Sequence, residues 1–463
     1  MNKKNYNRRK FLKQSLLASA ALSPFATLIG SLNSLKAAEI NGNYKAIVCV
    51  LLEGGSDVFN MIAPRDTSAY NAYQTARESI ALELTSLLPI NHSNQNGLNP
   101  GNYGFRNNMT RMQSLFNANK MAIIANVGTL IQPTTLTAIE NGTALPQQLF
   151  AHNTQRAQWF AGNAKGIETN GWGARVGDLF YPNPNPNPFF NVSIGGSNTL
   201  QQGGIADAIE FSDASISPDT MRTYGFGPDS GGGDLGNVYQ DIFENHRLNN
   251  NKLIAALANR RIKKLNQQVE LEGLFDGVQE FTGFTTGVHE TGVSLGQQLE
   301  LVAQILSIKD NFPENRKRQI FFVNHHGWDT HNTDNEQQVG YLSDSLGAFQ
   351  DAMQQLGLEN QVTTFTISDF GRSLTTNGSG TDHGWGSHAF VMGGAVNGGD
   401  IYGKMPVLSQ SSDDFWQERL IPTTAMEEYL ATLVKWFGAN ETELNTLFPN
   451  LNAFPSNDLG FMS

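Results

Sequence analysis

Short runs of consecutive apolar residues recur along the chain, separated by longer stretches in which apolar and polar residues mix. A run that is apolar at nearly every position is typical of a strand buried on both faces of a sheet, as in parallel sheets. The runs predict five strands, at residues 45–52, 121–127, 319–324, 361–368 and 389–392.

Between the third and fourth of these strands, apolar residues step by three and four from Val339 to Leu356, which predicts an amphipathic helix. Gly357 follows as its expected C-cap. A shorter helix is predicted over residues 109–116, and residues 250–280 are expected to be mostly helical. Strands that alternate with helices of this length predict an α/β fold, a three-layer α/β/α arrangement with a mostly parallel central sheet.

The N-terminus carries Asn7-Arg8-Arg9-Lys10-Phe11-Leu12, then a modestly apolar stretch and Ala37-Ala38. This pattern resembles a twin-arginine (Tat) export signal. We expect residues 1–38 to be the signal peptide and residues 39–463 to form a single domain with loop insertions at about 180–290. The resemblance implies the Tat translocase as a partner and a periplasmic or secreted location. The alternative is an N-terminal membrane anchor, which Pro24 and the small residues of the stretch disfavour.

The formal charge of −11 is unevenly distributed. The first 38 residues hold seven basic side chains and no acidic one, which leaves 24 basic and 42 acidic residues and a charge of −18 on the rest. A surface this acidic repels phosphate backbones and anionic lipid, so no nucleic-acid partner is expected. Cys49 is the only cysteine, which excludes an intramolecular disulfide and a multi-cysteine zinc site.

Five of the nine histidines lie between residues 325 and 388, and aspartates lie among them. Asp57, Asp329 and Asp369 each come shortly after a predicted strand. In parallel sheets, sites form where the carboxyl ends of the strands meet, so these groups can converge. Carboxylates and imidazoles without thiolates suit zinc or manganese, and oxygen ligands also accept magnesium or calcium. The alternative is a hydrogen-bonded network without an ion, in which an aspartate only forms a turn or caps a helix.

Several segments together resemble the domain-of-unknown-function 1501 family, which is placed in the alkaline phosphatase-like superfamily. They are Leu51 to Asp57, Gly327-Trp328-Asp329-Thr330-His331, Ser368-Asp369-Phe370-Gly371-Arg372, and Thr381-Asp382-His383-Gly384 through Gly394. The resemblance covers roughly residues 40 to 450 and implies an alkaline phosphatase-like fold with one or two divalent metal ions at the strand ends. It implies the metal ligands Asp57, Asp329, His331, Asp369, His383 and His388.

Within this set, we expect Asp329, His331 and one of His383 or His388 to bind one ion. The family pattern places a histidine directly after the later aspartate, whereas this chain has Phe370 there. That departure bears on a second ion, for which His383 or Asp382 could compensate.

The resemblance also implies a nucleophile at the start of a helix, where the family has a Ser-His pair. This chain has Ala151-His152 there, with Thr154 as a substitute nucleophile, and Arg372 could clamp an anionic group. The leading hypothesis is an exported metal-dependent hydrolase of small anionic phosphate or sulfate esters. The alternative is a non-catalytic binding or assembly protein that retains the alkaline phosphatase-like fold.

Overall fold

The computed structural model describes residues 43–95, 97–166, 168–182, 187, 189–205, 208–211, 241–272, 274, 278–284, 293–312 and 317–463. The predicted signal peptide lies outside this range. No helix among the described residues combines the length and the hydropathy that a membrane crossing requires.

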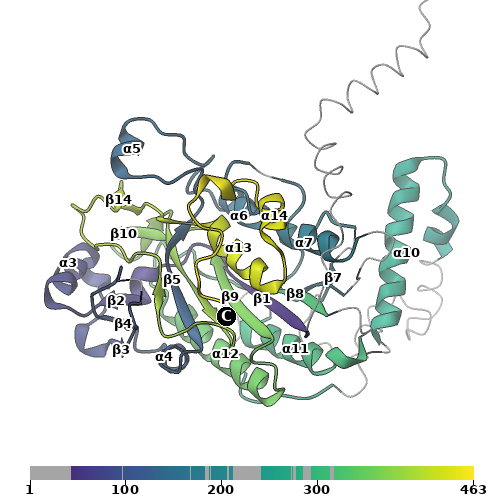
Figure 1. Ribbon diagram of the computed structural model, residues 1–463, viewed down its shortest axis with the longest axis horizontal. Coiled ribbons are helices and arrows are strands. Elements are labelled where there is room, and N and C mark those ends of the chain that lie inside the picture. The colour runs from purple at the N-terminus through teal and green to yellow at the C-terminus, as the bar shows by residue number, and fades with distance from the viewer. Residues whose placement is uncertain are drawn as a thin grey trace, which may run out of the picture.

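A nine-stranded sheet forms the centre of the molecule (Figure 1). Its order is β13 (Ile401–Tyr402), β5 (Met121–Gly128), β12 (Ser387–Met392), β9 (Val362–Ser368), β1 (Lys45–Leu52), β8 (Arg318–His325), β6 (Asn191–Ser193) and β7 (Ile209–Glu210), with β16 (Thr424–Ala425) also paired to β5. Every strand of this sheet runs in one direction except β12, which is antiparallel to both of its neighbours.

Both faces of the sheet are covered, and β1 shows why its sequence is apolar throughout. Ala46, Val48 and Val50 belong to one core, whereas Ile47 and Cys49 belong to the core on the other face, as the alternation of side chains along a strand requires. The first core also takes residues of α3 (Thr67–Arg77), α4 (Thr110–Asn117), α11 (Leu295–Ser307) and α12 (Glu336–Gln355). The second takes residues of α6 (His152–Ala161), α7 (Trp172–Phe180), α13 (Met426–Phe437) and α14 (Glu441–Leu447).

Smaller elements surround the sheet. They are a three-stranded sheet of β2 (Ile62–Pro64), β4 (Tyr103–Phe105) and β3 (Leu88–Ile90), the pairs β10 (Arg372–Thr376) with β11 (Thr381–His383) and β14 (Phe415–Trp416) with β15 (Arg419–Leu420), and the helices α5 (Leu136–Glu140) and α10 (Lys252–Glu272).

The predicted α/β class with a mostly parallel sheet is confirmed, and all five predicted strands lie in the central sheet. The expected helices are α4, α12 and α10, and Gly357 adopts the left-handed φ of +68° just beyond α12. The single-domain organisation stays a prediction.

The carboxyl ends of three neighbouring strands meet at one edge of the sheet. Leu52 of β1 is in register with His325 of β8 on one side and with Ser368 of β9 on the other. The segments that hold Asp57, Asp329 and Asp369 follow these three strands directly, so they start from the same edge. This edge is where the side chains predicted to form a site come together.

Candidate metal centre

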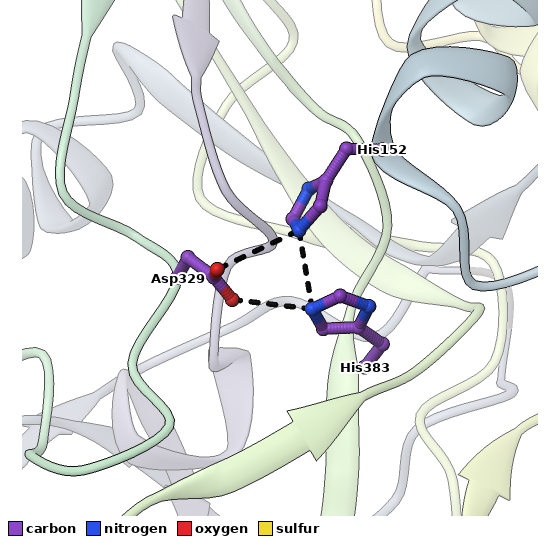
Figure 2. A group of neighbouring side chains, drawn as sticks. All are labelled: His152, Asp329 and His383. Atoms are coloured by element: carbon purple, nitrogen blue, oxygen red, sulfur yellow. Dashed lines mark hydrogen bonds and ion pairs between the residues drawn. The ribbon is translucent and has the colours of Figure 1, made fainter.

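Three histidines and one aspartate converge beyond this edge. His152 is the first residue of α6, His383 is the last residue of β11, and Asp329 and His331 lie in the loop after β8. The Nε2 atom of His383 lies 3.1 Å from Nε2 of His152, 2.9 Å from Nε2 of His331 and 3.2 Å from Oδ1 of Asp329. Figure 2 shows His152, Asp329 and His383 facing one another, and their ligand atoms lie within 4.8 Å of each other.

The opposite nitrogen of each imidazole ring faces an oxygen. Nδ1 of His383 donates to the carbonyl oxygen of Phe150 at 2.8 Å, and Nδ1 of His152 donates to Oδ2 of Asp369 at 2.8 Å. Nδ1 of His331 lies 3.3 Å from Oδ1 of Asp382. Because the Asp369 and Phe150 oxygens accept, the proton of a neutral His152 or His383 ring belongs on Nδ1, which leaves a lone pair on Nε2. The Nε2 atoms of the three rings face the same space, as in histidines that bind a metal.

The charge state of the ring and the carboxylate fits this arrangement. Burial lowers the pKa of His383, and the neighbouring His152 lowers it further, although the hydrogen bond to Phe150 opposes this. Burial alone would raise the pKa of Asp329, but the hydrogen bond and charge of Arg372 outweigh it and hold the pKa below its usual value. A neutral imidazole and an ionised carboxylate are the forms that ligate metals.

Asp369 holds the His152 ring from the Nδ1 side, opposite the cluster. Its carboxylate is fully buried and accepts two hydrogen bonds from Arg156, at 2.8 and 2.9 Å, besides the one from His152. Arg156 follows His152 by four residues on α6, so both side chains lie on one face of the helix. The Arg156 guanidinium also pairs with Glu53. Sequence reasoning missed Arg156 and Glu53, although the spacing from His152 to Arg156 was a usable signal.

Arg372 holds the other side of the cluster. Its buried guanidinium donates to Oδ1 of Asp329 at 2.7 Å, to the Gly54 carbonyl at 3.3 Å, to the Thr381 hydroxyl at 3.2 Å and to the Thr381 carbonyl. The N–H groups of the Arg372 guanidinium are thus hydrogen-bonded to oxygens of the protein. The structure thus places Arg372 as a support for Asp329, and an anion clamp at this residue would have to break those bonds.

Three residues predicted for the site lie apart from the cluster. The carboxylate of Asp57 is buried and pairs with the buried Arg77. Nδ1 of His388 accepts the backbone N–H of Asn126 at 2.9 Å, and burial lowers the pKa of His388 to about 4. The hydroxyl of Thr154 donates to Oε1 of Gln148 at 2.5 Å. Of the two histidines left open, the structure brings His383 to Asp329 and His331.

The ring of Phe370 fills the space beside two of the imidazoles. Its centroid lies 4.7 Å from that of His152 and 4.7 Å from that of His383. A hydrophobic wall therefore stands at the position where the family pattern has a histidine, next to the cluster and directly after Asp369.

Close backbone contacts fix the segment that carries Asp329 and His331. A Cβ atom on Gly54 would lie 2.4 Å from the backbone nitrogen of Asp329, and one on Gly380 would lie 2.3 Å from the Thr330 carbonyl oxygen. Both glycines allow neighbouring chain segments to approach this loop from two sides.

Comparison with known proteins gives distant likenesses. A protein in the alkaline phosphatase superfamily from Vibrio parahaemolyticus is 11% identical, covers 87% of this chain and 69% of its own, and has a TM-score of 0.37. The soluble domain of lipooligosaccharide phosphoethanolamine transferase A from Neisseria meningitidis is 8% identical over 92% and 95%, with a TM-score of 0.37. A sulfatase from Pseudoalteromonas sp. is 10% identical over 94% and 73%, with a TM-score of 0.31. At these TM-scores the likenesses carry no argument about function.

No curated protein matches the chain. Residues 313–441 match the model of a family described as protein of unknown function (DUF1501), and this stretch holds Asp329, His331, Asp369, Arg372 and His383. The resemblance predicted from the sequence is thus confirmed over residues 313–441, the stretch that matches the DUF1501 model.

Proposed function

We propose that His152, His331, His383 and Asp329 hold one divalent metal ion. The observation that carries this proposal is the convergence of three imidazole Nε2 atoms and one carboxylate oxygen, with Nε2 of His383 within 3.2 Å of each of the other three atoms. Lone pairs at about 3 Å repel each other and the carboxylate, whereas a cation between them turns each repulsion into an attraction. The hydrogen bonds at Nδ1 of His152 and His383 leave Nε2 of both rings free to ligate the ion.

The donor set favours some ions over others. Three imidazole nitrogens and a carboxylate suit zinc or manganese, whereas magnesium and calcium prefer oxygen ligands throughout. Zinc and manganese are therefore preferred among the four predicted ions. One ion is proposed because Phe370 occupies the space beside the cluster and Asp57 is engaged by Arg77.

For this centre we propose hydrolysis of phosphate or sulfate esters. A bound divalent ion acts as a Lewis acid toward an ester oxygen. The protein's part is to fix the ligands in advance: Asp369 and Arg156 orient the His152 ring, the Phe150 carbonyl orients His383, and Arg372 orients Asp329.

One observation keeps a non-catalytic binding role as the second candidate. No serine or threonine hydroxyl of the described residues is hydrogen-bonded to any of the four proposed ligands, and the Thr154 hydroxyl is engaged by Gln148. Ala151 stands at the N-cap of α6, where the family pattern has a serine. Hydrolysis would then depend on a water nucleophile.

Metal analysis tests the centre. We expect the purified protein to bind one equivalent of zinc or manganese, and His331→Ala to weaken that binding more than about 100-fold, since even outer-shell partners contribute 10–100-fold. His246→Ala is the matched control, because His246 is exposed and its ring contacts Asn249. Equal metal content in the wild type and His331→Ala, measured by elemental analysis, would rule out the centre.

Turnover separates the two functions. The metal-loaded protein is expected to hydrolyse an aryl phosphate or an aryl sulfate, and His331→Ala to lose that activity. A wild type that binds its ion but turns over no ester across such a panel would support the binding or assembly role.

We further propose that the protein is exported through the Tat translocase to the periplasm or beyond. The predicted signal motivates this, because Arg8 and Arg9 belong to a pattern read by a receptor. Replacing both by lysine is expected to leave the protein in the cytoplasm, as arginine and lysine are not interchangeable at such sites. Fractionation of cells that express each form checks this, and unchanged export of the double variant would contradict it.

A further inference from the structure

Exposed hydrophobic side chains concentrate on one helical region far from the candidate metal centre in sequence. Among the described residues, eight large hydrophobic side chains are exposed, and five of them lie between residues 242 and 257. Leu248 is 95% exposed, Leu253 82% and Leu257 54%, and Ile242 and Ile254 are also exposed. Single exposed leucines are common on protein surfaces, whereas several on one segment indicate an interaction surface.

Three of the five lie on α10. Leu253, Ile254 and Leu257 are spaced so that they share one side of the helix, whereas Ala258 and Ile262 on another side are buried. Arg260 and Arg261 follow Leu253 by seven and eight residues, so they continue the exposed side toward the C-terminus of the helix, and both are exposed. The uncovered face of α10 is thus apolar at its start and basic further along.

The charge of this region is opposite to that of the rest of residues 39–463. Between Arg247 and Val269 the sequence has six basic residues and no acidic one. The remainder of residues 39–463 has 18 basic against 42 acidic residues. The predominantly acidic chain therefore has a basic stretch here, and the exposed leucines lie within it.

The helix also lies away from the central sheet. In Figure 1, α10 stands at the outer side of the molecule, beyond the β7 edge of the sheet and apart from the helices that cover the two faces. The helix therefore lies at the periphery of the described structure.

We propose that the exposed face of α10 binds a membrane surface that contains anionic lipid. Leucines on one face together with arginines and lysines are the composition of helices that lie in the interface of a bilayer. The leucines would enter the boundary of the acyl chains, and the basic side chains would contact the anionic headgroups. The proposal is independent of the metal centre and of any reaction there.

Residues 1–38 are themselves basic and apolar and could tether the full chain to vesicles. The experiment must therefore report contact with the membrane at α10 itself, and not only binding of the chain. An environment-sensitive fluorophore is attached through Leu253→Cys in the full chain. The native Cys49 is fully buried, so the label goes to the introduced cysteine. Val407→Cys is the matched control, since Val407 is a 58% exposed apolar residue on another surface.

With vesicles of phosphatidylcholine and phosphatidylglycerol, we expect the emission at position 253 to shift to the blue and the emission at position 407 to stay unchanged. Vesicles of phosphatidylcholine alone are expected to give a much weaker shift. Arg260→Gln with Arg261→Gln should weaken binding to the mixed vesicles by about 30-fold, since each basic side chain near an anionic surface contributes ~1 kcal/mol. The control pair Lys404→Gln with Val407→Ser should leave it unchanged.

Two results would overturn the proposal. The first is an unshifted label at position 253 on vesicles to which the protein binds. The second is a stable dimer in light scattering that dissociates when Leu253 and Leu257 are replaced by serine, because it would assign the face to a second copy of the chain.

Discussion

Asp57 and Asp329 begin from the same edge of the sheet but have different surroundings. Asp57 comes five residues after β1 and Asp329 four residues after β8. Asp57 is buried against the guanidinium of Arg77, which also donates to the backbone carbonyls of Ser373 and Leu374. Asp329 is half-exposed, faces three imidazole rings and is held by Arg372. An aspartate after a strand thus marks the edge, and its partners decide whether it stabilises the fold or is available to a ligand.

The largest effect should come from breaking the Asp57 pair. Arg77→Ala leaves a buried carboxylate without its cation, and we expect the free energy of unfolding to fall by about 3–5 kcal/mol. Metal affinity of the variant that remains folded should be unchanged. Denaturant unfolding and metal titration measure the two quantities. A loss of metal binding in folded Arg77→Ala would show that Asp57 belongs to the centre after all.

Glu427 is a buried carboxylate that forms no ion pair with a cation among the described residues. Glu427 accepts from the backbone N–H of Ala164 at 3.0 Å and from Asn450 at 3.2 Å, while its Oε2 has no hydrogen-bond partner among the described residues. Burial raises the pKa of Glu427 from 4.5 to about 7. A raised pKa in the folded state means that folding favours the protonated form of Glu427. The stability that this form contributes is fully present below pH 4.5 and is lost as the pH rises through about 7.

Glu427→Gln mimics the protonated acid and should remove this loss. We expect the variant to be more stable than the wild type by up to about 3 kcal/mol at pH 8, at ~1.36 kcal/mol per pKa unit, and to have no advantage at pH 4. Unfolding curves at both values check this. An advantage of equal size at the two pH values would mean that charge is not its origin.

The smallest effect is expected at Arg372, which holds Asp329, with Arg77, which holds Asp57, as its counterpart. Arg372→Lys removes the fork that orients Asp329, and we expect metal affinity to fall by about 10- to 100-fold, as for other outer-shell partners. Arg77→Lys is the matched control and should not change metal affinity. If both variants bind metal like the wild type, Arg372 does not position the carboxylate.

The sequence was sufficient for the sheet but not for the direction of every strand. Apolar runs located all five predicted strands because burial on both faces requires such runs. An apolar run does not indicate in which direction its strand runs in the sheet. The residues 389–392 therefore do not distinguish the antiparallel β12 from the parallel strands.

For the candidate site, clustering of histidines and aspartates identified Asp329, His331 and His383. His152 came only from the family resemblance, which implied it as a catalytic residue and not as a metal ligand. His383 and His388 are five residues apart and indistinguishable in sequence. One ends β11 and faces the cluster, and the other lies inside β12 against Asn126. Arg77 lies twenty residues after Asp57 on α3, so their pairing depends on how that helix packs, which local pattern does not determine.

The close approach at Gly54 and Gly380 has a consequence for evolution and for engineering. Neither residue has a side chain, yet any side chain there would push on the backbone next to Asp329 or Thr330. In a randomised library selected for occupancy of the centre, these two positions should tolerate almost no replacement, while Asp57 would be constrained only through folding. A scan for positions that tolerate no substitution would then identify the glycines that shape the loop as clearly as the side chains that could contact an ion.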